Sequence, residues 1–300
     1  MLGSALQNGA PPPAARICRR GLLQPRGVFP LSLAPVADIP LASSEASRHT
    51  LRSLDPSHGL EFTHLQNAEA LCGGPQGLLR SAAAAVADAG TGDAGGDPAD
   101  PTEPEIRALT RFGHETGLML ETAAVGRLLD NAVFVGQGLE HRVVAPTGTG
   151  CVVKDYDPRV IDLETFDIFY KPAENVFDYL TDHLLANHFF GDDIRLYGLY
   201  VEQSHLHVLL TQPFIAGRHP VWEEMVALLE EQGLQHERQG SQQSRFWVNG
   251  GEAGRILVTD VHEDNVIVTS SRQAHPIDVH FSFPGRAARL QALQKLGLWY

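Results

Sequence analysis

The chain has 300 residues, 43% of them hydrophobic, which is enough for one or two domains with a buried core. Its formal net charge is -13, and residues 1–60 hold six Arg against three acids, so the remainder carries about -16. Such an acidic body repels phosphate backbones, which argues against nucleic-acid binding through a broad basic face. No apolar run approaches the roughly 20 residues that span a bilayer, so no membrane association is expected. Three scattered cysteines, Cys18, Cys72 and Cys151, suit neither a disulfide framework nor a zinc cluster, and indicate a reducing, cytoplasmic setting.

The composition changes near residue 104. Residues 1–103 include "GAPPPAAR" and "SAAAAVADAGTGDAGGDPADPTEP" and have little sustained periodicity. Such a segment cannot bury enough apolar surface to offset its chain entropy. We therefore predict a largely disordered leader, with a short helix around "AEALCGGPQGLLRSAAAAVADA" as its only candidate element.

From residue 104 onward, apolar residues recur at helical or strand spacing. The sequence predicts helices over 104–120, 121–132, 174–190 and 220–234. Strands are predicted over 133–146, 148–156, 206–215, 245–250, 254–261, 265–270 and 275–282. The apolar face of the third helix must pack on something, which we expect to be the sheet. This order indicates an α+β fold and not a regular βαβ alternation.

Lys154 closes the apolar strand "GCVVKDY", although the chain has only three lysines beside 20 arginines. A lysine there needs an anionic partner. Upstream, Gly136 and Gly138 in "VGQGLEHRVV" lie in a strand-turn-strand setting where backbone amides can approach phosphates. Each glycine alone is also explained as a plain turn residue. Together, the glycine turn, the return strand and a lysine 16 residues after Gly138 follow the order of a kinase nucleotide lobe, with His141 in place of that pattern's third glycine.

A second candidate lies in "TDVHEDNVIVTSSRQAHPIDV". We expect "NVIVTS" and "QAHPIDV" to form a hairpin that turns at residues 271–272. Pairing outward from this turn sets Val268 opposite His275 and Asn265 opposite Asp278, and opposed residues lie about 5 Å apart. The Asn265 amide oxygen and the Asp278 carboxylate would then converge, which suits Mg²⁺ carrying the phosphates of a nucleotide.

Asp260 lies five residues before Asn265, across a tight loop. A carboxylate there can accept a proton from an attacking hydroxyl or orient it. The motif Asp260-x-His262-x-x-Asn265, followed by the aspartate of "PIDV", resembles the catalytic and metal loops of kinase-like phosphotransferases, especially those of the aminoglycoside-phosphotransferase type. Residues 104–283 resemble more closely the kinase domain of bacterial polyvalent proteins, through "GQGLEHRVV", "VVK", "DYLTDHLLANHFFGDDIRLYGLY", "LLTQPFIAG" and "DVHEDNVIV...PIDV".

This resemblance implies an ATP-binding, two-lobed fold, with a nucleotide lobe over 104–212 and a reduced helical lobe over 213–300. It implies Lys154 on the α- and β-phosphates, Asp260 as catalytic base, and Asn265 and Asp278 on Mg²⁺. His262 would stabilise the catalytic loop. An inter-lobe hinge over 212–217 would place Gln212 and Phe214 beside the nucleotide. The acceptor would be a hydroxyl of an unknown protein or small molecule.

The sequence departs from well-known protein kinases at the acid partner of Lys154 and after Asp278. The helix after the lysine strand should offer a glutamate to Lys154, but it carries Glu174, Asp178 and Asp182, of which we favour Asp178. After Asp278 the chain reads "VHFSF", so we expect no activation segment and no full peptide-binding lobe.

Two further functions remain as alternatives. One is a pseudokinase or nucleotide sensor that binds ATP without transfer. The other is a metal hydrolase built on histidines, for which His205 and His207 alternate on one strand face and could combine with His262 and His280.

Overall fold

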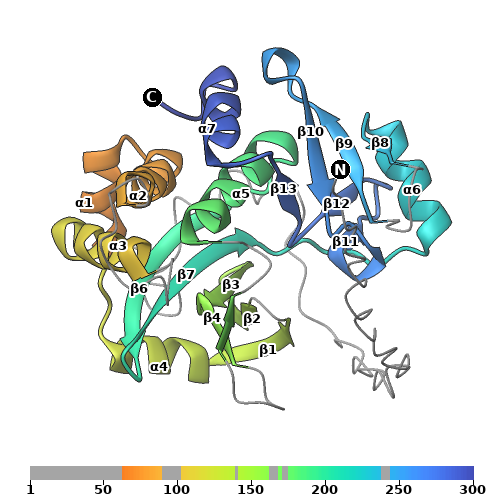
Figure 1. Ribbon diagram of the computed structural model, residues 1–300. Coiled ribbons are helices and arrows are strands. Elements are labelled where there is room, and N and C mark those ends of the chain that lie inside the picture. Colours follow the sequence, from red (N-terminus) through yellow and green to blue (C-terminus); the bar gives the residue numbers. More distant parts are fainter. Residues whose placement is uncertain (1–62, 90–102, 139–140, 162–167, 171–174, 238–243) are drawn as a thin grey trace, which may run out of the picture. The chain divides into compact units, whose positions relative to one another are not determined.

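The computed structural model describes residues 63–89, 103–138, 141–161, 168–170, 175–237 and 244–300. These residues form antiparallel sheets and seven α-helices (Figure 1), which confirms the predicted α+β class. Among them, no helix combines the length and the apolar character that crossing a bilayer would require.

The larger sheet has five strands in the order β1-β2-β3-β7-β6, with every neighbouring pair antiparallel. Strand β3 lies in the middle and is buried along its whole length. Lys154 therefore stands inside the sheet, with Val143 and Leu210 as its partners on the flanking strands. The strands are β1 (Ala132–Gln137), β2 (His141–Pro146), β3 (Cys151–Tyr156), β6 (Arg195–Glu202) and β7 (His205–Pro213).

Shorter strands form a four-stranded sheet, β13-β10-β9-β8, and two separate pairs, β11-β12 and β4-β5. The four-stranded sheet buries Phe246, Val258 and Phe281 in the hydrophobic core. The bounds are β4 (Arg159–Ile161), β5 (Ile168–Tyr170), β8 (Gln235–His236), β9 (Phe246–Asn249), β10 (Arg255–Thr259), β11 (Val266–Val268), β12 (Ala274–Pro276) and β13 (His280–Ser282).

The helices are α1 (Thr63–Cys72), α2 (Pro75–Ala89), α3 (Glu103–Thr116), α4 (Thr122–Asp130), α5 (Val176–Phe189), α6 (Trp222–Glu231) and α7 (Arg286–Lys295). Helix α5 packs on α2 and also contacts β13, and Figure 1 shows it between these two elements. Asn175 caps α5 by accepting a hydrogen bond from the Asp178 amide. This helix is buried over most of its length, because it meets other elements on several sides.

Helix α2 and the end of α1 lie where the sequence predicted a short helix within residues 1–103. Helix α2 buries Leu78, Leu79 and Val86 in the core, and it contacts α1, α3 and α5. The Ala-rich sequence looked too weakly hydrophobic to fold alone, but its small side chains allow close packing on two neighbouring helices. The remaining residues of that range lie outside the described residues.

The sequence interpretation missed β6 and α7. Strand β6 is joined to β7 by Gln203 and Ser204, whose φ angles of 48° and 68° suit a two-residue type I′ turn. This turn type usually carries Asn-Gly or Asp-Gly, so its usual sequence signal is absent. Helix α7 follows Gly285 in a segment that has three arginine and lysine side chains but only a weak apolar pattern.

Candidate active site

The Lys154 ammonium is buried inside the larger sheet and binds the carboxylate of Asp278. Its Nζ lies 2.5 Å from Asp278 Oδ1, and the Lys154 side chain keeps only 4% of its surface exposed. A buried ammonium requires such a counter-charge, because moving it out of water is costly. The sequence therefore predicted correctly that Lys154 needs an anionic partner, and the partner is one of the two predicted metal ligands.

Asp278 is held in the left-handed region, with φ of 51°, between β12 and β13. Burial would raise the pKa of its carboxyl, but the Lys154 ammonium and the neighbouring His141 outweigh burial and hold the pKa well below its usual range. The carboxylate is thus ionised at neutral pH. About 29% of its side chain stays exposed, so a ligand can reach it.

Asn265 ties the predicted catalytic loop to Asp278. Its amide nitrogen donates to the Asp260 carbonyl at 3.0 Å, to Asp260 Oδ2 at 3.2 Å and to the Asp278 carbonyl at 3.4 Å. Asp260 has φ of 61°, a strained backbone conformation for a residue with a side chain. The three predicted residues therefore lie together in the structure.

The donor set fits a hard cation. With its amide nitrogen engaged, Asn265 presents an amide oxygen that has no hydrogen-bond partner among the described residues. Asp278 adds a carboxylate, and amide and carboxylate oxygens are the ligands that Mg²⁺ prefers. Because Asp278 also binds Lys154, metal and lysine would compete for the same carboxylate.

The hairpin behind this site has a different register from the predicted one. Strands β11 and β12 pair Val268 with Ala274, and Val266 with Pro276, one residue away from the predicted alignment. The turn contains three residues, with Arg272 at φ of 61°, and the Thr269 carbonyl accepts from the Arg272 amide. Such a type I turn followed by a left-handed residue adds one residue to the loop.

The sequence predicted that Asn265 pairs with Asp278. In the structure Asn265 pairs instead with Ile277, the residue before Asp278. The Asn265 carbonyl accepts from the Ile277 amide at 2.8 Å. The left-handed backbone of Asp278 then turns the chain, and the side-chain amide of Asn265 makes the connection to Asp278 instead. The predicted proximity is correct, although the predicted strand pairing is wrong.

His262 lies next to Asp260, with Nε2 3.7 Å from Asp260 Oδ1. Both side chains are exposed to a similar degree, at 38% and 51%. A loop-stabilising role for His262 therefore stays a prediction.

The glycine turn between β1 and β2 leads to an inward-facing histidine. The Gly138 amide donates to the His141 carbonyl, and Gly136 follows a bulge in β1. His141 is buried, its Nε2 lies 2.9 Å from Tyr179 Oη, and its Nδ1 lies 3.8 Å from Asp278 Oδ1. From the sequence, His141 was noticed only because it stands where the kinase pattern has its third glycine. In the structure it lies beside Asp278, the partner of Lys154.

Asp178 does not bind Lys154, which corrects the favoured pairing. Its Oδ1 lies 3.0 Å from Arg289 Nε, and Asp182 Oδ1 lies 2.7 Å from Arg289 Nη1. These two acids are one helical turn apart on α5, so they share a face that meets α7. The missed helix α7 supplied the cation that the sequence interpretation lacked.

A different face of α5 lies near Lys154 and carries His183. This imidazole is buried, and its Nε2 has no hydrogen-bond partner among the described residues. Burial, supported by the positive charge of Lys154, lowers the pKa of His183 well below its usual range. The side chain is therefore neutral beside the Lys154 and Asp278 pair.

Gln212 and Phe214 stand at the end of β7, where a hinge was predicted. Gln212 is buried and faces the same side of the sheet as Lys154, because it pairs with Val152, two residues before the lysine. Its Nε2 is buried without a partner in the described part of the chain. The Phe214 amide donates a hydrogen bond to the Gly150 carbonyl, and the residue is 40% exposed.

The histidines of the hydrolase alternative are engaged separately. His207 Nδ1 lies 3.1 Å from Asp155 Oδ1, and His280 Nδ1 lies 3.2 Å from Asp182 Oδ2. His262 neighbours Asp260 in the loop. Within the described ranges, no three His, Cys, Asp or Glu side chains are grouped to hold a metal, so this alternative has no structural support.

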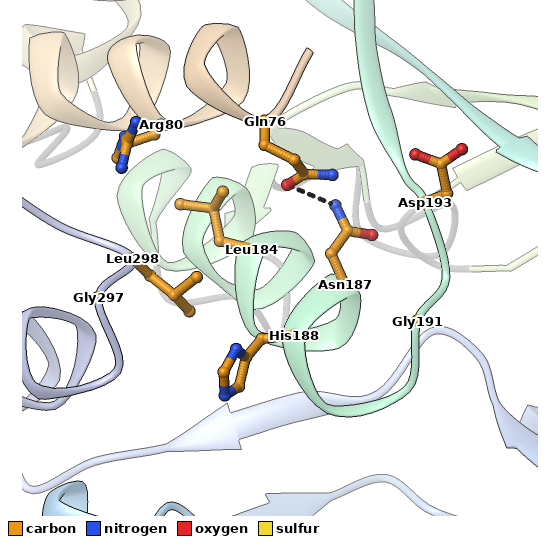
Figure 2. A pocket seen from close by; sticks show the side chains of 9 residues that line it. All are labelled: Gln76, Arg80, Leu184, Asn187, His188, Gly191, Asp193, Gly297 and Leu298. Atoms are coloured by element: carbon orange, nitrogen blue, oxygen red, sulfur yellow. Dashed lines mark hydrogen bonds between the residues drawn. The ribbon is translucent and has the colours of Figure 1, made fainter. Parts of the chain in front are cut away.

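A pocket of about 400 Å³ lies elsewhere, between α2, α5 and the residues after α7 (Figure 2). Figure 2 shows Asn187 hydrogen-bonded to Gln76 on its wall. None of its lining residues is among the predicted site residues. On one side it is bounded by Gly191 and Asp193, from the segment that joins α5 to β6.

Comparison with known families agrees with the motif order. A family model described as a serine/threonine/tyrosine kinase found in polyvalent proteins matches residues 103–283. No curated protein and no solved structure matches the chain.

Proposed function

Because the chain belongs to the kinase family found in polyvalent proteins, we propose that it transfers the γ-phosphoryl group of ATP to a hydroxyl of a protein or small molecule. The observation that carries this proposal is the convergence of Lys154, Asp278 and Asn265 from distant parts of the sequence. A buried lysine, an ionised carboxylate and a free amide oxygen are suited to the phosphates and metal of a nucleotide.

Each residue has a role that follows from its position. The Lys154 ammonium would neutralise the α- and β-phosphates, while the Asn265 and Asp278 oxygens would hold Mg²⁺. When bound, the metal would neutralise charge on the β- and γ-phosphates. Asp260 would orient the acceptor hydroxyl and accept its proton. Open space beside Gly136 and Gly138 leaves room for phosphates at the turn.

The proposal includes a division into a nucleotide lobe, 104–212, and a reduced lobe, 213–300. Lys154 would come from the first part, and Asp260, Asn265 and Asp278 from the second. Gln212 would lie beside the base of the nucleotide, where its unpaired amide can donate to a ring nitrogen or carbonyl. Neither nucleic acid nor a membrane is expected as a partner.

The test combines binding and transfer. Thermal-shift titration with Mg-ATP should stabilise the intact protein, and radiolabelled ATP should label an acceptor or the protein itself. Asp260→Asn should bind ATP within about threefold of the unchanged protein but lose transfer, because only the base is removed. Asp278→Ala should lose both. Absence of any stabilisation by Mg-ATP contradicts the proposal.

A nucleotide sensor without transfer is the second candidate. Stabilisation by ATP without transfer to protein or small-molecule acceptors, autophosphorylation included, would select this function.

A further inference from the structure

Asp192 is a buried acid without a partner. It is only 6% exposed, and its Oδ1 is buried without a hydrogen bond in the described part of the chain. A buried carboxyl that makes no hydrogen bond is rare in folded proteins and calls for an explanation. It lies in the segment between α5 and β6, between the residues Gly191 and Asp193 that Figure 2 labels.

The other buried acids of the described chain are all engaged. Glu105 binds Arg286 and the Phe177 amide, and Asp155 accepts from Tyr200. Asp182 binds Arg289. Asp192 is therefore the one buried acid of these ranges that is free to accept a new cation.

Asp192 lies three residues before the first residue of β6, Arg195. Lys154, Leu210 and Leu196 form one row across β3, β7 and β6. Because β6 and β7 are antiparallel, the direction from Leu210 to Gln212 on β7 is the direction from Leu196 on β6 back toward Asp192. The backbone at Gly191 and Asp193 has positive φ, at 72° and 52°, so the conformation on both sides of Asp192 is unusual and specific.

The charges of Lys154 and Asp278 both act on Asp192. Burial raises the pKa of Asp192 to about 7, the Lys154 ammonium opposes this rise, and the Asp278 carboxylate adds to it. Ionisation of Asp192 would be favoured whenever Lys154 turns toward it.

The proposed nucleotide site makes conflicting demands on Asp278. In the structure the Asp278 carboxylate forms an ion pair with Lys154, whereas nucleotide binding would require its oxygens as metal ligands. Once Asp278 is engaged elsewhere, a lysine that is 4% exposed lacks a protein counter-charge. Neither Asp178 nor Asp182 can supply one, because Arg289 holds both.

We propose that Asp192 is the positioning acid that receives the Lys154 ammonium when Asp278 turns to the metal-bound nucleotide. This inference rests on the proposed function. It assigns to the segment between α5 and β6 a role that the sequence had placed on α5 itself. The exchange moves the lysine from Asp278 to Asp192 and leaves the Asp278 oxygens to the metal.

The deciding experiment measures how nucleotide binding depends on Mg²⁺. Asp192→Asn removes the charge at nearly constant size, and Asp193→Asn is the matched control one residue away, where the acid pairs with Arg195. ATP affinity is measured by calorimetry without metal and across a Mg²⁺ titration. Asp192→Asn should bind metal-free ATP within about twofold of the unchanged protein but need about tenfold more Mg²⁺, a coupling of ordinary size.

Asp192→Glu keeps the acid, so it should need nearly as little Mg²⁺ for ATP binding as the unchanged protein. Asp193→Asn should need the same Mg²⁺ concentration as the unchanged protein. Equal loss of affinity with and without metal in Asp192→Asn indicates a structural role and overturns the inference. An unchanged Mg²⁺ dependence overturns it as well. If Asp192→Asn does not fold, the Asp192→Glu measurement decides, because a Mg²⁺ dependence far from that of the unchanged protein contradicts the inference. Absence of ATP binding by the unchanged protein removes the proposed function instead.

Discussion

The Lys154 ammonium lies 2.5 Å from the Asp278 carboxylate, although 124 residues separate them in the sequence. This pair joins the central strand of the larger sheet to the segment after the β11 and β12 hairpin. It holds the lysine beside a metal-ligand candidate.

Lys154→Met should destabilise the protein by about 3 kcal/mol, because it leaves the Asp278 charge in a partly buried place without its counter-ion. The double variant with Asp278→Asn should regain much of this loss, since no unpaired charge remains. Urea unfolding measures both. Lys295→Met, at an exposed position of α7, is the control and should change stability by less than about 0.5 kcal/mol. A Lys154→Met protein as stable as this control contradicts the ion-pair role.

Arg289→Met should destabilise by about 3 kcal/mol or more, because it leaves Asp178 and Asp182 without their shared cation. Arg289→Lys should rescue only part, since an ammonium cannot bridge both acids as the planar guanidinium does. Arg107→Met is the matched control, because Arg107 forms an exposed pair with Glu103. Equal unfolding free energies for Arg289→Met and Arg107→Met would show that α7 does not anchor α5.

Arg272→Gly should leave stability unchanged or raise it by up to about 1 kcal/mol, because glycine adopts the left-handed backbone without steric cost. Arg272→Val should lower stability, since a β-branched residue tolerates this conformation poorly. Chemical denaturation of the two variants measures the difference. Similar stabilities for both would contradict a left-handed backbone at Arg272.

Gly217→Ala should destabilise by about 2 kcal/mol, because the new methyl would lie 2.5 Å from the Val268 carbonyl oxygen and the Ile267 side chain. Gly126→Ala is the control, since that glycine lies in α4 with nothing within 4 Å of the added methyl. This control should gain up to about 1 kcal/mol from helix propensity. A tolerated Gly217→Ala would mean that the chain before α6 does not pack closely on β11.

Asp192→Asn should change how stability depends on pH. The pKa of Asp192 is raised to about 7 in the folded protein, so the folded state holds a proton that the unfolded state releases near pH 4. This carboxyl therefore contributes stability at low pH that is lost as pH rises toward 7. Metal-free melting temperatures from pH 5 to 8 should fall more steeply in the unchanged protein than in Asp192→Asn. Parallel pH curves would show that Asp192 has an ordinary pKa.

The identity and order of the residues were enough to predict several groups of the candidate site. Lys154 in an apolar strand required an anion, and the spacing from Asp260 to Asn265 predicted a loop with converging polar groups. These inferences succeeded because burial of charge and the strand pattern are local properties. The family match over residues 103–283 agrees with this reading.

Only the tertiary structure decided which acid meets which cation. From the sequence, Asp178 was the favoured partner of Lys154. In the structure Asp178 binds Arg289, 111 residues later on the unpredicted helix α7, because contacts with α7 set which face of α5 turns toward it. The hairpin register shifted by one because Arg272 adopts a left-handed conformation without glycine. The sequence therefore determined which charged groups the site contains, while long-range packing, which sets the orientation of α5 and the backbone turns, determined how they pair.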